Sequence, residues 1–203
     1  MAKISQCKQG SEEWFEKRKG HLTASHGQTI AANGKGLESY VIALLSEKYS
    51  SAQTERYTND DMARGVDLEP VARSIYELTT GNEVEEVGFI EFDKYTLISP
   101  DGLIGKDGGV EFKCLNDTNH VKAILFGEKA IDKKYLWQVQ MSLLLTKRKY
   151  WDLVLFNPNF SQSMLIFRIT KDEAMHDKLK KGLSKGKQLI KELEKKINGR
   201  TKT

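Results

Sequence analysis

The sixteen residues from Ser99 to Cys114 constrain the fold of this chain more than any other segment. Their second half alternates apolar and charged residues, which is the period of a half-buried β-strand. On such a strand Glu111 and Lys113 lie on one face, about 7 Å apart at roughly 3.3 Å per residue. A tight hairpin at Gly108-Gly109 would fold Asp101 back beside Glu111.

Two carboxylates that meet at a strand pair form a hard-oxygen site suited to Mg²⁺, because this ion keeps several waters and needs few protein ligands. A surface hairpin is the alternative, in which the Glu–Lys pair contributes only roughly a few tenths of a kcal/mol. The segment Glu111-Phe112-Lys113 alone favours the surface hairpin. The ordered set that also contains Pro100-Asp101 is more specific and favours the metal site.

Composition indicates an ordinary globular chain, which we expect to form a single domain over residues 1–203. Hydrophobic residues make up 39% and charged residues 30% of the sequence. No apolar run approaches the roughly 18–20 residues of a membrane span, and no signal-peptide pattern opens the chain. Cys7 and Cys114 have no metal-binding spacing, so we expect reduced thiols in a cytosol-like compartment and no membrane association.

Charge is concentrated at the C-terminal end of the sequence. Residues 171–203 carry a net charge of +6, whereas the preceding 170 residues carry −2. A long amphipathic helix is predicted over about 171–197, with Gly182 and Gly186 weakening its middle. It could be a packed or oligomer-facing helix with a solvated basic face, or a DNA-binding arm. Its apolar side would be formed by Met175, Leu179, Leu183, Ile190, Leu193 and Ile197.

The first thirty residues predict two short helices. Ser11 opens a helix that ends near Gly20, and Thr23 and Ser25 are expected to cap a second one. Arg18 could be a solvated charge. It could equally form an anion site with the Ser25 hydroxyl at a helix N-terminus.

A helix is predicted over Asp60–Thr80, after a helix over 37–49 and a polar linker over 50–58. Its apolar stripe would contain Val71, Ile75 and Leu78. Glu69 lies one turn before Arg73, so the two could form an exposed ion pair. Alternatively, Glu69 could turn inward as a third carboxylate of the metal site.

The remaining segments predict a sheet covered by helices. Helices are expected over 120–130 and 132–146, and the glutamines of the second, Gln138 and Gln140, could simply face water. Strands are expected over 84–92, 95–98, 110–115, 150–156 and 164–169. The pattern therefore predicts an α/β fold with a mixed central sheet of about five strands.

Five segments in this order resemble one family: W-F-E-K-R-K-G-H-L-T-A-S, R-G-V-D-L-E-P-V-A-R, S-P-D-G, E-F-K-C and W-Q-V-Q. The chain is similar to the phage-type alkaline 5′→3′ exonucleases, the lambda-exonuclease or YqaJ-like viral recombinase family of the PD-(D/E)XK nuclease superfamily. The similarity spans about residues 14–157 and implies a restriction-endonuclease-like core.

The resemblance implies a role for each matching residue. Asp101, Glu111 and the backbone carbonyl of Phe112 would bind the metal. Lys113 would position or activate the attacking water, and a neighbouring cation would lower its pKa. Glu69 would orient water or metal from its helix.

Three further residues are assigned by the same resemblance. Gln138 would support the site, and Arg18 with Ser25 would hold the 5′-terminal phosphate of the strand being cut. The sequence departs from the family pattern at residues 115–119, so no additional phosphate contact is assigned there.

The implied activity is digestion of linear double-stranded DNA from its 5′ ends, with Mg²⁺ as cofactor and Mn²⁺ as a substitute. The 3′ overhangs would serve recombination by strand annealing. The family also implies a ring-shaped homotrimer, a single-strand annealing protein as partner, and the cytoplasm of a phage-infected or prophage-bearing bacterium.

Two other functions fit parts of the sequence. The same fold could be an endonuclease of the restriction or junction-resolving type, although an end-binding pair such as Arg18 and Ser25 argues against it. The chain could also be a non-catalytic DNA-binding accessory protein of recombination. An intact set of Asp101, Glu111 and Lys113 argues against a dead site.

Overall fold

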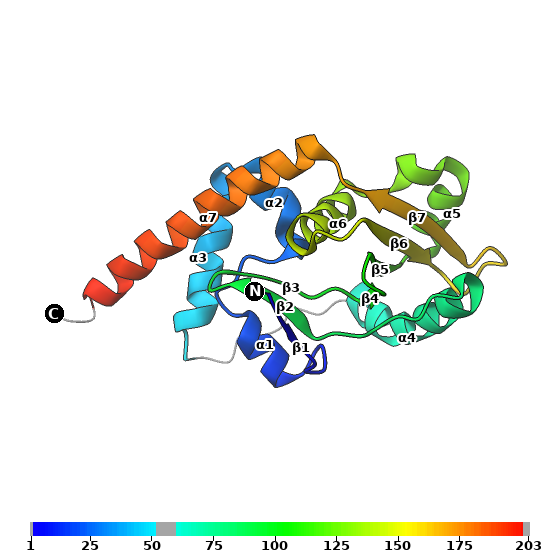
Figure 1. Cartoon of the computed structure of the whole chain (residues 1–203), viewed down its shortest axis with the longest axis horizontal. Helices are drawn as coiled ribbons and strands as arrows, with labels where there is room; N and C mark the ends of the chain where they lie inside the picture. Colours follow the sequence, from blue (N-terminus) through cyan, green and yellow to red (C-terminus); the bar gives the residue numbers. More distant parts are fainter. Residues whose placement is uncertain (1, 52–59, 201–203) are drawn as a thin grey trace.

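A computed structural model describes residues 2–51 and 60–200 of the chain (Figure 1). Most of the linker predicted over 50–58 lies outside these residues. No helix in the described part is long and apolar enough to cross a membrane.

The main sheet is mixed and has four strands in the order β4-β5-β6-β7. Strands β5 and β6 are parallel, whereas the β4–β5 and β6–β7 pairs are antiparallel. The predicted sheet of about five strands is therefore wrong in its number, although its mixed character is confirmed. The strands are β4 (Gly102–Ile104), β5 (Gly108–Cys114), β6 (Tyr150–Phe156) and β7 (Met164–Thr170).

The strands predicted over 84–92 and 95–98 form a separate antiparallel sheet with the N-terminus, in the order β1-β2-β3. Its strands are β1 (Lys3–Ser5), β2 (Phe89–Asp93) and β3 (Thr96–Ile98). The segment that follows runs from β3 through Pro100 into β4, so it carries the chain from the small sheet to the main one.

Helices cover both faces of the main sheet, as expected for an α/β fold. One face packs on helix α4 (Asp60–Thr80), through a core that includes Ala72, Tyr76, Phe112 and Phe156. The other face packs on α6 (Lys133–Thr146), with α2 (Gly27–Ala32) and α7 (Glu173–Arg200) behind it. The other helices are α1 (Glu12–Arg18), α3 (Lys35–Tyr49) and α5 (Asp117–Phe126), with 3₁₀ turns at Ala24–His26 and Gly127–Ala130.

The hairpin between β4 and β5 turns earlier than predicted. The turn is formed by residues 105–107, where Gly105 adopts a positive φ of 48°. Gly108 and Gly109 lie within β5 instead, beneath the aromatic rings of the neighbouring strand β6. A Cβ atom on Gly109 would lie 2.5 Å from the Trp151 ring, so these glycines are required by close packing rather than by a turn.

Two helical predictions need correction. In α4, Val71 and Leu78 are exposed by 46% and 86%, because the buried face is formed by Ala72 and Tyr76, one position further along. Thr23 does precede a 3₁₀ turn, but its side chain makes no capping hydrogen bond.

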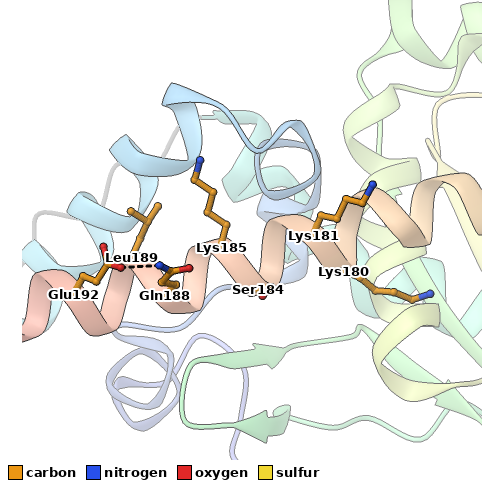
Figure 2. Close-up of a pocket in the computed structure, with 7 residues that line it drawn as sticks. All are labelled: Lys180, Lys181, Ser184, Lys185, Gln188, Leu189 and Glu192. Carbon is orange, nitrogen blue, oxygen red and sulfur yellow. Dashed lines mark hydrogen bonds between the residues drawn. The ribbon is translucent and has the colours of Figure 1, made fainter.

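The long C-terminal helix α7 confirms the predicted amphipathic pattern, with Leu179, Leu183 and Ile190 buried. The helix continues without interruption through Gly182 and Gly186. A Cβ atom on Gly182 would lie 1.8 Å from the backbone oxygen of Ile30, so glycine lets α2 pack against α7 at close range. The opposite face of α7 carries lysines (Figure 2).

Candidate active site

The β4–β5 hairpin brings Asp101 beside the predicted acid–lysine pair. Gly102 pairs with Val110, so Asp101 lies next to the following residues of β5. Asp101 Oδ2 accepts a hydrogen bond of 2.7 Å from the backbone N–H of Phe112. The predicted approach of Asp101 to this strand is confirmed, even though the turn lies elsewhere.

Glu111 and Lys113 share one face of β5, as the alternation predicted. Lys113 Nζ lies 2.6 Å from Glu111 Oε1. Gln138 Nε2, from helix α6, donates to the same carboxylate oxygen. Gln138 therefore faces the strand and not water, and it holds the carboxylate of a nearly fully buried glutamate in a fixed orientation.

The carbonyl of Phe112 lies on the same side of β5 as Asp101. The N–H and C=O of one strand residue point to the same edge, and the N–H of Phe112 points to Asp101. Strand β4 begins only at Gly102, which pairs with Val110, so β4 does not extend along β5 as far as Phe112. This carbonyl is thus available as an oxygen ligand beside the carboxylate.

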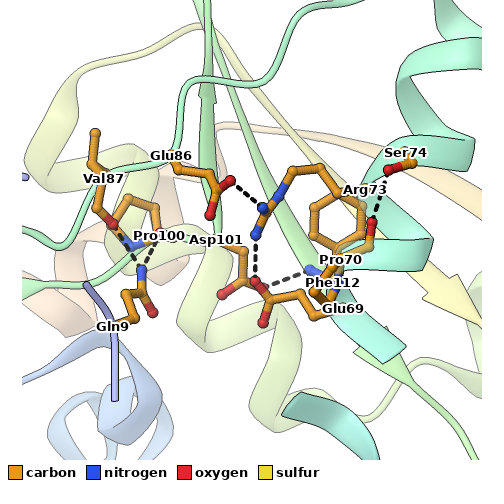
Figure 3. Close-up of polar contacts among 10 residues, drawn as sticks. All are labelled: Gln9, Glu69, Pro70, Arg73, Ser74, Glu86, Val87, Pro100, Asp101 and Phe112. Carbon is orange, nitrogen blue, oxygen red and sulfur yellow. Dashed lines mark hydrogen bonds and ion pairs between the residues drawn. The ribbon is translucent and has the colours of Figure 1, made fainter. Parts of the chain in front are cut away.

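Glu69 approaches the cluster from helix α4 (Figure 3). Its Oε1 lies 2.8 Å from Arg73 NH2, so the predicted pair one helical turn apart is present. Arg73 NH1 also lies 2.5 Å from Glu86, in the segment before β2. Arg73 is largely buried, and it fixes Glu69 on the side of the helix that faces Asp101.

A neighbouring contact holds the strand entry in place. Gln9 Nε2 donates hydrogen bonds of 2.8 Å to the backbone oxygens of both Val87 and Pro100. The N-terminal segment therefore fixes the residue immediately before Asp101 (Figure 3).

Burial raises the pKa values of all three carboxyl groups, and the charge of Asp101 adds to this effect at Glu111 and Glu69. Burial, and then the charge of Asp101, raises the pKa of Glu111 to about 8. The same two causes raise the pKa of Glu69 to about 7. Burial also raises the pKa of Asp101, against the opposing charge of Lys113. A group of carboxyl groups with raised pKa values is typical of a functional site. The pKa values are raised because the nearby positive charge does not fully compensate the ionised oxygens.

Lys113 is the main cation of this cluster. Burial acts to lower its pKa, but the charges of Glu111 and Asp101 outweigh burial and raise it above the ordinary value. Its ammonium group also lies 5.3 Å from the centroid of the Tyr135 ring. The predicted lowering of this pKa concerned Lys113 beside a metal ion and stays a prediction.

The oxygen atoms at this corner fit a hard divalent cation. No group of three or more His, Cys, Asp or Glu residues that could hold a metal ion is found within residues 2–51 and 60–200. Asp101, Glu111 and the Phe112 carbonyl would therefore share the ion with water, which suits Mg²⁺.

Arg18 is the last residue of helix α1, and it lies close enough to the carboxylates for its charge to interact with that of Glu111. Its guanidinium group stacks 4.1 Å above the Trp14 ring and donates a hydrogen bond of 2.6 Å to Ser99 Oγ. Burial lowers the pKa of Arg18, and the charge of Glu111 opposes this lowering, so the two groups share one electrostatic environment. Arg18 is thus not a freely solvated charge.

Ser25 lies beside a cavity of about 240 Å³ that Arg18 helps to line. Its hydroxyl is 3.1 Å from Thr23 Oγ1 and 3.4 Å from His26 Nδ1, two residues of the cavity wall. No hydrogen bond joins Ser25 to Arg18 within the described residues, so their joint role in binding a phosphate stays a prediction. Burial, and then the charge of Arg18, lowers the pKa of His26.

Sequence reasoning missed three participants. Ser99, which binds Arg18, stands two positions before Asp101 and could have been found from that proximity. Arg73 was noticed only as the partner of Glu69. Glu86 gave no signal, because its contact with Arg73 depends on the tertiary fold.

The main sheet is mixed and flanked by helices, and it carries two carboxylates and a lysine at the open end of the β4–β5 hairpin. This arrangement defines a nuclease-like fold of the PD-(D/E)XK class. Residues 13–149 match the YqaJ-like viral recombinase domain, and the chain belongs to this family. The resemblance predicted from the five motifs is confirmed.

Solved structures agree with this assignment. The alkaline exonuclease LHK-Exo from Laribacter hongkongensis is 29% identical, with a TM-score of 0.78 over 93% of this chain and 99% of its own. The structure of LHK-Exo in complex with dAMP matches equally well. A phage-related exonuclease from Haemophilus somnus 129PT, at 16% identity, a TM-score of 0.64 and coverage of 87% and 96%, shares the fold. No match was found among curated proteins.

Proposed function

We propose that this protein is a Mg²⁺-dependent exodeoxyribonuclease that digests linear double-stranded DNA from its 5′ ends. The observation that carries the proposal is the convergence of Asp101, Glu111 and Lys113 at the start of the main-sheet hairpin. The similarity over 93% of the chain to an alkaline exonuclease, also solved with a deoxynucleotide, supports the same substrate class.

The metal would be held by Asp101, Glu111 and the carbonyl of Phe112, with Mn²⁺ as a possible substitute. When bound, such an ion supplies Lewis-acid stabilisation and an acidified water for phosphodiester hydrolysis. Lys113 presents its ammonium group at the same corner and orients the attacking water. Gln138 keeps the Glu111 carboxylate in place, and Glu69 would orient water or the metal from helix α4.

The environment of Arg18 supports recognition of a terminal phosphate. A phosphate dianion would gain a guanidinium donor already fixed by Trp14 and Ser99, with the Ser25 hydroxyl next to Thr23 and His26 of the same cavity wall. Such a contact sets register without reading sequence, which suits an enzyme that begins at any 5′ end.

Family membership supports a proposal for the biological setting. We propose a ring-shaped homotrimer that encloses DNA, a single-strand annealing protein that takes up the 3′ overhang, and action in recombination in the cytoplasm of a phage-infected or prophage-bearing bacterium.

The test uses a linear duplex labelled on one strand, with or without a 5′ phosphate, and a closed circle in parallel. With Mg²⁺ we expect mononucleotides from phosphorylated 5′ ends and intact circles. EDTA and Lys113→Ala should abolish the reaction, whereas Lys149→Ala, which removes a lysine exposed by 74%, should not.

Each other outcome assigns a different function. Cleaved circles would make the protein an endonuclease. DNA that is bound but never cut with any divalent metal would leave a non-catalytic accessory protein. Loss of the preference for a 5′ phosphate in Arg18→Ala, with cleavage retained, would support the phosphate role separately.

A further inference from the structure

The outer face of α7 carries a row of lysines that the active site does not use. Lys178, Lys181 and Lys185 are exposed and follow one another at intervals of three and four residues, so they lie on one side of the helix. None of the three forms an ion pair within the described residues. Lys180 and Lys187, by contrast, pair with Asp177 and Asp93. We call Lys178, Lys181 and Lys185 the lysine row.

A groove of about 600 Å³ follows this face of the helix (Figure 2). Two members of the lysine row line it, together with the neutral hydrogen-bonding side chains of Ser184 and Gln188. Its one acidic residue, Glu192, accepts a hydrogen bond of 2.8 Å from Gln188. All residues that line the groove belong to α7, so no opposing wall can enclose a small molecule. The shape suits an extended ligand that lies along the helix.

The positive charge of the C-terminal region indicates which kind of extended ligand would bind there. Residues 171–203 carry a net charge of +6, whereas the rest of the chain carries −2. Lys178 and Lys185, the two ends of the lysine row, are seven positions apart, which is about 10 Å at 1.5 Å per residue. A DNA duplex carries one negative charge for each 1.7 Å or so of its axis, so several phosphates would lie within reach of the row.

We propose that the lysine row of α7 is a second DNA-binding surface, which contacts the phosphate backbone of the duplex away from the cleavage site. The contact is independent of sequence, because ammonium groups on an open face meet phosphates and not base edges. Only the choice of DNA as the polyanion rests on the proposed function.

The test measures binding of the full-length protein to a fluorescent duplex in EDTA, where no cleavage occurs, over a series of salt concentrations. The triple variant Lys178→Gln, Lys181→Gln and Lys185→Gln should bind at least about tenfold more weakly at 0.1 M salt. The slope of log affinity against log salt should become shallower by about two to three, at roughly 0.9 for each lost phosphate contact.

A matched variant removes three exposed lysines outside α7, at Lys106, Lys122 and Lys129, none of which forms an ion pair within the described residues. It should keep the wild-type salt slope. The kcat on saturating DNA should be unchanged in both variants, because neither touches the catalytic cluster. Circular dichroism and melting temperatures confirm that both fold.

Equal slopes in the wild type and the lysine-row variant would overturn the proposal, as would an equal loss in the matched variant, which would indicate net charge alone. Unchanged DNA binding with lost binding of an acidic protein would assign the row to a protein partner instead. Failure of the proposed function is a separate result, because the wild type would then bind DNA without cutting it.

Discussion

Replacing Glu111 with glutamine should abolish cleavage and yet stabilise the metal-free protein at alkaline pH. Burial and Asp101 raise the pKa of Glu111 from 4.5 to about 8. Ionisation of such a group weakens the fold, by roughly 5 kcal/mol at about 1.4 kcal/mol per pKa unit. Glutamine keeps an oxygen for Lys113 and Gln138, but its buried NH₂ group needs an acceptor, so we expect a net gain of about 2–4 kcal/mol.

The sign of the effect depends on pH. Because the pKa is raised in the folded state, wild-type stability is complete below pH 4.5 and is lost as the pH rises to about 8. The variant should therefore be less stable than the wild type by about 1–3 kcal/mol at pH 4.5, where only the cost of the buried NH₂ group remains, and should show its full gain at pH 9.

Urea unfolding in EDTA at these two pH values measures the gain. Glu128→Gln, which removes an exposed carboxylate, is the control and should show no such dependence. Mg²⁺ should stabilise the wild type at pH 9 and have much less effect on the variant. A variant that is less stable than the wild type at pH 9, or equally stabilised at both pH values, would refute the electrostatic reasoning.

Three further predictions concern the support of the fold and the site. Arg73→Ala should lower kcat/KM by about 10- to 100-fold, because Glu69 and Glu86 lose the guanidinium group that holds both carboxylates. Arg73→Lys should restore part of the activity, and an unchanged kcat/KM in Arg73→Ala would contradict the prediction. Tyr76→Phe should lower the free energy of unfolding in urea by on the order of 1.5–3 kcal/mol, because the Tyr76 hydroxyl donates a hydrogen bond of 2.6 Å to the buried Asp152. A decrease below about 0.5 kcal/mol would refute this prediction. Gly182→Ala should destabilise by about 1–3 kcal/mol, whereas Gly65→Ala, in open space on α4, should stabilise slightly; melting temperatures that move in the same direction would oppose the packing argument.

The local parts of the site could be predicted from the sequence. Alternation along β5 placed Glu111 and Lys113 on one face, and the predicted hairpin placed Asp101 beside them, although its turn lies at residues 105–107 and not at Gly108-Gly109. The predicted bounds of α4 are also those observed, although its predicted apolar stripe is wrong at Val71 and Leu78. Each of these features depends on residues close together in the chain, where period and turn chemistry act directly.

The features that could not be predicted from the sequence depend on contacts between residues far apart in the chain. The positions of Gly109 and Gly182 are set by a ring on β6 and a backbone oxygen on α2, which no local pattern reveals. Gln138 faces Glu111 only because the parallel β5–β6 pairing carries α6 across the sheet. The sheet has fewer strands than predicted for the same reason, since strand propensity does not say which strands pair.

The bond between Asp101 and the Phe112 N–H has a consequence for solubility. Beyond Val110, strand β5 has no β4 neighbour, and an uncovered strand edge invites pairing with another molecule. The carboxylate that the nuclease site needs also occupies this edge. A substitution that removes the acceptor, such as Asp101→Ala, would therefore add a risk of aggregation to the loss of activity. Asp101→Asn keeps an acceptor at the edge, and it is the better inactive form for isolating a complex with uncut DNA.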